Sequence, residues 1–70
     1  MRDPNRLDNF YATLCKIHKE SFPDLRFGQL ISNFSDWLAA KKQIDIFFPE
    51  EDKMINYIIE YRDSFKRRQV

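Results

Sequence analysis

The sequence contains one cysteine, one glycine and one histidine in 70 residues, and each scarcity limits what the chain can do. A single cysteine cannot form an internal disulfide, which a small secreted domain normally needs to stay folded. A single glycine cannot build the glycine-rich loop that holds nucleotide phosphates. The cysteine content therefore favours the reducing cytoplasm as the location.

Long apolar runs and a strong net charge are also missing. No apolar run approaches the roughly 18 residues of a membrane span. Residues 1–6 carry charges and a proline in place of the apolar centre of a signal peptide. Twelve Lys and Arg balance eleven Asp and Glu, and the net charge of +1 is far below that of a dedicated nucleic-acid binder. We expect a cytoplasmic protein outside the membrane.

The composition is that of a folded chain, with 43% hydrophobic and 33% charged residues. At about half the usual domain size, the chain has material for one core. We therefore predict a single domain over residues 1–70.

Apolar residues recur at helical spacing in two segments of the first half. The first helix is predicted to begin at the Asp3–Pro4 pair and to end before Pro23. The second is predicted to run from an Asp24 cap to about Lys42. Short polar side chains in 32–36 compete for backbone hydrogen bonds, which leaves open whether this helix is continuous or broken. The predicted apolar faces contain Leu7, Phe10, Tyr11, Leu14 and Ile17 in the first helix, and Phe27, Leu30, Ile31, Phe34 and Leu38 in the second.

A third helix is predicted after an extended connector. Residues 44–48 favour strand, but no second strand is available to pair with them. Pro49 suits a helix start, and acidic residues follow it where the macrodipole favours negative charge. The predicted fold is an all-α compact bundle of three helices, or four if the second helix breaks.

Aromatic residues are abundant, with seven Phe, three Tyr and one Trp. The extended connector would send the adjacent Phe47 and Phe48 rings to opposite sides, one toward the core and one toward a partner. Either every large apolar group packs in one dense core, or some form an interface with a second copy or another protein. The candidate interface residues are Trp37, Phe47, Tyr57 and Ile59.

The sequence offers little catalytic or metal-binding chemistry. Cys15 and His18 lie three residues apart on the first helix, about 60° apart around its axis, but no orienting group accompanies them, so we expect no nucleophile and base pair. A half-buried thiol and a histidine at the core boundary are the simpler interpretation. Asp45 and the acidic residues 50–52 match no calcium loop and suit a helix start, with a hard-cation site as the alternative. We expect no enzyme activity, cofactor, metal or small-molecule substrate.

Two basic clusters lie at predicted helix ends. The first contains Lys41 and Lys42, and the second contains Lys66, Arg67 and Arg68. Positive charge at a helix C-terminus complements the macrodipole. The alternative function is a small accessory protein that uses these residues to contact nucleic-acid phosphates.

Two segments carry a family resemblance. Residues 23–33, PDLRFGQLISN, and 45–52, DIFFPEED, are similar to short uncharacterised proteins of bacteria and their phages. Those proteins carry a PDLRFGQLI-x-N stretch followed by a D-x-F-Y-x-E-D stretch. This chain departs from them in Phe48, where tyrosine is usual, and in Pro49 and an added acidic residue. The resemblance implies a small cytoplasmic protein of bacterial or phage origin and transfers no catalytic residue.

The first motif predicts architecture. Asp24 is expected to cap the second helix, and Gly28 to allow a close helix crossing, with an anion site at the helix start as the alternative. Gln29 and Asn33 lie one turn apart and form a polar stripe available to the connector backbone or to a partner.

Opposite charges link the two motifs in a further hypothesis. Arg26 is expected to pair with Asp45 or with the acidic residues 50–52. Together, the sparse chemistry and the many aromatics favour a non-enzymatic interaction module that self-associates or binds a larger bacterial or phage protein.

Overall fold

The computed structural model describes residues 2–68, with side chains for 2–66, and these residues form an all-α bundle without strands. Helix α1 spans Arg6–Ser21, α2 spans Phe27–Trp37, and α3 spans Glu51–Arg68. A π-helical segment, η1, spans Leu38–Lys42 and continues α2. The predicted all-α bundle of three helices is confirmed.

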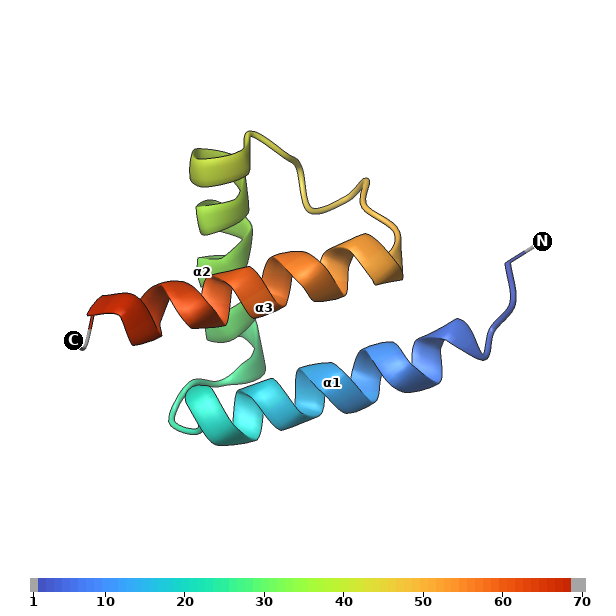
Figure 1. The fold of residues 1–70 in the computed structure, drawn as a ribbon, viewed down its shortest axis with the longest axis horizontal. Coiled ribbons are helices and arrows are strands. Elements are labelled where there is room, and N and C mark those ends of the chain that lie inside the picture. Colours follow the sequence, from blue (N-terminus) through green and yellow to red (C-terminus); the bar gives the residue numbers. More distant parts are fainter. Residues whose placement is uncertain (1, 69–70) are drawn as a thin grey trace.

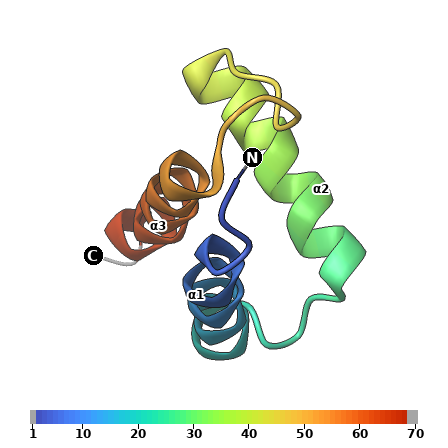
Figure 2. The same cartoon turned by 90° about the vertical axis from the view of Figure 1, so that its right-hand side faces the viewer.

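Helices α1 and α3 run in the same direction and lie side by side, while α2 crosses them (Figures 1 and 2). Figure 2 looks nearly along both helices. The return path between the two parallel helices consists of α2, η1 and the connector over residues 43–50. The starts of α1 and α3 therefore lie at the same end of the molecule.

The boundaries of α1 follow local sequence signals. The Asp3 carboxylate accepts a hydrogen bond from the Asn5 backbone N–H at 3.0 Å, which is cap-like. Regular helix starts only at Arg6, slightly later than predicted. The helix ends at Ser21, before Pro23, because proline disfavours helical conformation in the residue that precedes it.

The prediction that Asp24 caps α2 is wrong. Asp24 lies exposed in a turn closed by the Leu25 N–H, which donates to the Phe22 carbonyl at 3.2 Å. The cap position is Arg26, whose backbone is extended (φ −70°, ψ 155°). Its N–H donates to Gln29 Oε1 at 2.9 Å, which is one half of a capping box.

Helix α2 passes through residues 32–36 without a break. The irregularity comes later, in the wider turns of η1. The helical run ends at Gln43, the one described non-glycine residue with positive φ (59°). Its N–H donates to the Ala39 carbonyl at 3.1 Å, and left-handed residues commonly end helices in this way.

The connector turns where an extended course was predicted. The Asp45 carboxylate accepts from the Phe47 N–H at 2.9 Å, and the Asp45 carbonyl accepts from the Phe48 N–H at 3.1 Å. The two rings contact each other edge to face, with centroids 5.1 Å apart, and both are exposed. The prediction that one ring enters the core is wrong because the backbone bends here.

The core forms where α2 crosses α1 and α3. Tyr61 is central to it, because its ring packs against those of Phe22, Phe34, Trp37 and Phe65 with centroids 5.1–5.6 Å apart. The buried residues of the core are Ile17, Leu30, Phe34, Leu38, Ile58 and Tyr61.

Candidate interaction surfaces

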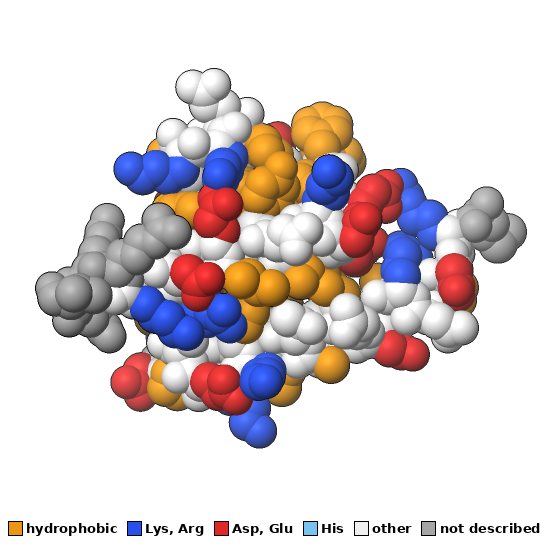
Figure 3. Space-filling view, viewed as in Figure 1, with side chains coloured by type: hydrophobic (Ala, Val, Ile, Leu, Met, Phe, Trp, Pro, Cys, Tyr) orange, Lys and Arg blue, Asp and Glu red, His pale blue; other side chains and the backbone are white. Residues whose placement is uncertain are grey.

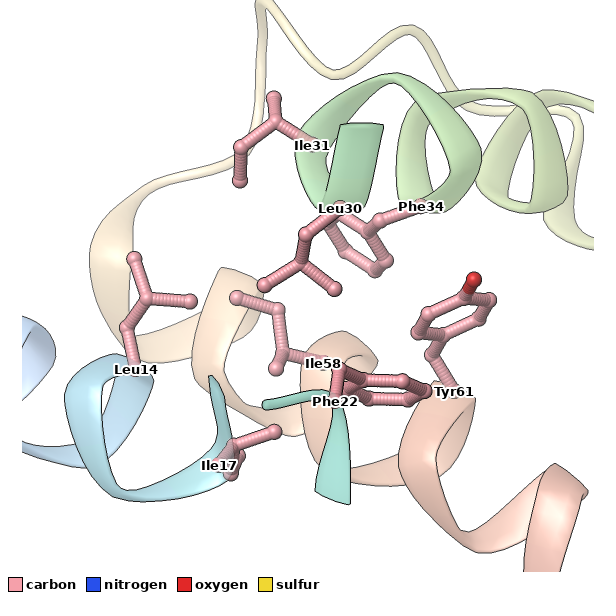
Figure 4. Close-up of a pocket in the computed structure, with 8 residues that line it drawn as sticks. All are labelled: Leu14, Ile17, Phe22, Leu30, Ile31, Phe34, Ile58 and Tyr61. Atoms are coloured by element: carbon pink, nitrogen blue, oxygen red, sulfur yellow. The ribbon is translucent and has the colours of Figure 1, made fainter. Parts of the chain in front are cut away.

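The void in the core is too small for a ligand. Side chains from the three helices converge on a void in the core that measures about 10 Å³ (Figure 4). This volume is at the lower limit for one water molecule, and the lining is hydrophobic. Any binding by this chain is therefore argued from its surface.

His18 forms a hydrogen bond that supports the fold. It is half-buried, and its Nε2 lies 2.7 Å from the Leu25 carbonyl oxygen, to which a protonated Nε2 donates. The bond ties the end of α1 to the turn before α2. Cys15 is exposed, so the expected half-buried thiol is wrong. Cys15 and His18 lie three residues apart on α1, and no hydrogen bond joins their side chains.

Two kinds of feature are absent from the described residues. No group of three or more His, Cys, Asp or Glu side chains is arranged to hold a metal ion. None of the described helices is both long enough and apolar enough to cross a membrane.

The acidic start of α3 is neutralised by arginines from the N-terminal segment. Arg2 pairs with Glu50 at 2.6 Å and Arg6 with Glu51 at 2.8 Å. Acidic and basic side chains adjoin where α1 and α3 begin, at the right of Figure 3. The hydrogen bond from Arg6 is the main reason that the pKa of Glu51 lies below its ordinary value.

The expected pairing of Arg26 with these acids is wrong. Among the described residues, Arg26 pairs with neither Asp45 nor the acidic residues 50–52. The reason is topological: Arg26 precedes α2, whereas the acidic residues follow η1. The parallel arrangement of α1 and α3 brings the N-terminal arginines to the acids instead.

Gly28 does not provide the expected helix crossing. It is exposed, and a Cβ added there would meet nothing within 4 Å. Helix α2 crosses its neighbours on another face, through Leu30 and Phe34. The polar stripe is also local: the Gln29 side chain accepts the Arg26 N–H, and the exposed Asn33 side chain makes no hydrogen bond to a described residue.

The candidate interface residues do not share one degree of exposure. Trp37, Tyr57 and Ile59 are half-buried and pack against the core, whereas Phe47 is 82% exposed. Helical periodicity assigns Tyr11 and Phe27 to the faces that pack against the core. Both side chains are largely exposed, so periodicity alone does not identify them as surface residues. The exposed large hydrophobic residues are Tyr11, Phe27, Phe47, Phe48 and Phe65.

The basic clusters are only partly free. Lys42 pairs with Glu60, which ties η1 to α3 and neutralises one cation of the expected basic surface. Lys41 and Lys66 are exposed at the ends of η1 and α3. The side chains of Arg67 and Arg68 lie outside the described residues.

Two surface features stand out in chemistry. We call Phe47 and Phe48 the aromatic tip, at the bend of the α2–α3 connector. A shallow depression on the α1–α2 corner, here the basic groove, has apolar and basic lining. Its lining residues are His18, Lys19, Pro23, Leu25, Arg26 and Phe27.

Comparison with known families, with curated proteins and with solved structures finds no match for this chain. The resemblance to short bacterial and phage proteins therefore stays a prediction. Function must be inferred from the two surface features and their surroundings.

Proposed function

We propose that this chain is a non-enzymatic protein-interaction module that self-associates or binds a larger bacterial or phage protein through the aromatic tip. The observation that carries the proposal is the exposure of two adjacent phenylalanines, 82% for Phe47 and 72% for Phe48. Aromatic side chains commonly dominate the binding energy of interfaces.

The tip is held in place by the fold. On its N-terminal side, Ile44 and Ile46 pack against the core and anchor the connector. Asp45 accepts the Phe47 N–H, and the two rings brace each other. A preorganised anchor loses less conformational entropy on binding than a flexible one.

The tip has no visible part in holding the fold together. Neither Phe47 nor Phe48 belongs to the core or to the residues packed against it. Two exposed phenyl rings are a liability for a protein that stays alone in water, since such patches promote association. Contact with a protein partner would explain why two phenylalanines stand at these positions, whereas the stability of the fold does not explain it.

Site-specific photo-crosslinking in living cells tests this proposal. A photoreactive phenylalanine derivative at position 47 is expected to form a discrete protein adduct. The matched control is the same group at Asn33, which is exposed on α2 away from the tip, and it is expected to form no such adduct. The proposal fails if position 47 gives no discrete adduct or gives the same products as position 33.

A further inference from the structure

We infer that the aromatic tip of one molecule docks into the basic groove of a second copy, in a head-to-tail arrangement. This inference rests on the proposed function and names the partner. It is carried by the complementary polarity and charge of two surfaces on the same chain.

The basic groove offers an apolar floor with a positive rim. Pro23, Leu25 and Phe27 supply the apolar surface, and Phe27 is 62% exposed. Lys19 and Arg26 are exposed, and neither forms an ion pair with a described residue. Glu20 and Asp24 are exposed and neighbour the lining residues in sequence, but neither acidic side chain is part of the lining. It therefore suits an apolar group that carries negative charge beside it.

The aromatic tip presents that chemistry. The connector and the α3 start contain four acidic residues, of which Glu50 and Glu51 are neutralised by arginines. Asp45 and Asp52 remain: each accepts a local backbone hydrogen bond, and neither forms an ion pair within the described part of the chain. Two phenyl rings flanked by uncompensated carboxylates complement two uncompensated cations around an apolar floor.

The groove lies before α2, whereas the tip lies in the connector that leaves the far end of η1 and turns back toward the start of α3 (Figures 1 and 2). A molecule does not fill its own groove with its own tip, because Phe27 of the groove and both rings of the tip are exposed. A contact between two different surfaces leaves one tip and one groove free, so the assembly can grow beyond a dimer.

The contact area is small, so we expect the association to be weak. The two exposed rings present on the order of 300 Å² of apolar surface, well below the roughly 800 Å² that each partner contributes to a stable complex. Association is therefore expected only at high protein concentration. Because the charged groups are solvent-exposed, added salt is expected to weaken it.

A mixing experiment with two complementary variants tests the inference. The tip variant is Phe47→Ser with Phe48→Ser, and the groove variant is Lys19→Glu with Arg26→Glu. Controls are Tyr11→Ser, which removes an exposed aromatic outside both surfaces, and Lys16→Glu, which reverses an exposed charge on α1. Circular dichroism and thermal unfolding verify that each variant folds. Molar mass is then measured by sedimentation over a wide concentration range at low salt.

The wild type is expected to exceed its 8.6 kDa monomer mass as concentration rises, and to continue past the dimer. Both controls should behave like the wild type, and each complementary variant alone should stay monomeric. An equal mixture of the two variants should form a dimer that grows no further, because one intact tip meets one intact groove. A monomeric wild type, or a mixture that stays monomeric, overturns the inference.

Failure of this inference is separable from failure of the proposed function. If position 47 crosslinks in cells to a protein of different mass and the purified chain stays monomeric, the second copy is wrong as partner while the interaction function stands. If position 47 yields no adduct at all and the chain stays monomeric, both are wrong.

Discussion

Tyr61 shows how one side chain can connect burial, packing and titration. It is only 5% exposed and contacts aromatic rings from α2, from α3 and from the end of α1. Burial disfavours the phenolate, so the pKa of Tyr61 is raised above its ordinary value of about 10.

Alkaline pH should therefore destabilise the fold through Tyr61. The folded state favours the neutral phenol, so the stabilisation is complete below pH about 10 and is lost as pH rises through the raised pKa. Tyr61→Phe keeps the ring without the titrating group and should show a flatter decline in the free energy of unfolding above that pH. Urea unfolding of both proteins over neutral to alkaline pH measures this, and identical slopes would contradict it.

Gln43 is a second residue whose backbone decides its energetics. Its φ of 59° lies in the left-handed region, which glycine adopts without steric cost. Gln43→Gly is expected to raise the free energy of unfolding by about 0.5–1 kcal/mol, measured by urea denaturation. Gln43→Ala keeps the Cβ and should bring no gain. An equal gain from alanine would mean that the helix end is not strained.

At the scale of elements, α2 is held in position by the packing of one apolar face against the core. Leu30, Phe34 and Leu38 follow each other at four-residue spacing and are buried, whereas Gly28 points to open space. The contrast allows a paired test on the same helix, because the two positions predict opposite effects.

Leu30→Ala should destabilise the protein by about 2–5 kcal/mol, since it removes buried methyl groups and leaves a cavity. Gly28→Ala should be neutral or stabilise by roughly 0.5–1 kcal/mol, because alanine lowers the entropy of the unfolded chain and meets no neighbour. Chemical denaturation of the two variants compares them directly. Strong destabilisation by Gly28→Ala would restore the close-crossing role that the structure contradicts.

The pairing of Arg6 with Glu51 links the starts of α1 and α3. Because the pKa of Glu51 is lowered in the folded state, its contribution is present above the ordinary carboxyl pKa and is lost as pH falls through the lowered value. Glu51→Gln should therefore reduce the loss of melting temperature on acidification. Glu60→Gln, which removes the exposed partner of Lys42, serves as a control for general charge effects. Equal acid sensitivity of Glu51→Gln and the wild type would contradict the assignment.

At the scale of the whole molecule, local sequence signals were sufficient to predict the helices but not to predict which helices pack side by side. Helical periodicity and proline positions predicted three helices, because those signals depend on neighbours within one or two turns. The order in space depends on long-range packing. This is why Arg26 was wrongly expected to meet the acidic residues, which the parallel arrangement of α1 and α3 gives to Arg2 and Arg6.

The sequence predicted that some aromatic residues form an exposed surface, but it did not identify all the residues that form it. An excess of aromatic residues indicated exposed apolar surface, and Phe47 was among the residues chosen. Phe48 and Phe27 were not among them. Phe48 was left out because the connector was assumed to be extended, and Phe27 because the start of the second helix was assumed to face the core. The turn held by Asp45 and the late start of α2 decide both cases, and neither is readable from hydrophobic periodicity.

The central claim, that the aromatic tip contacts the basic groove of another copy, is tested most directly by nuclear magnetic resonance on the unmodified chain. Amide resonances are recorded while the protein is diluted at low salt. The account predicts that resonances of residues 45–48 and 18–27 move together with concentration, while those around Tyr11 on α1 stay fixed. Resonances that do not move, or that move only outside these two segments, would contradict it.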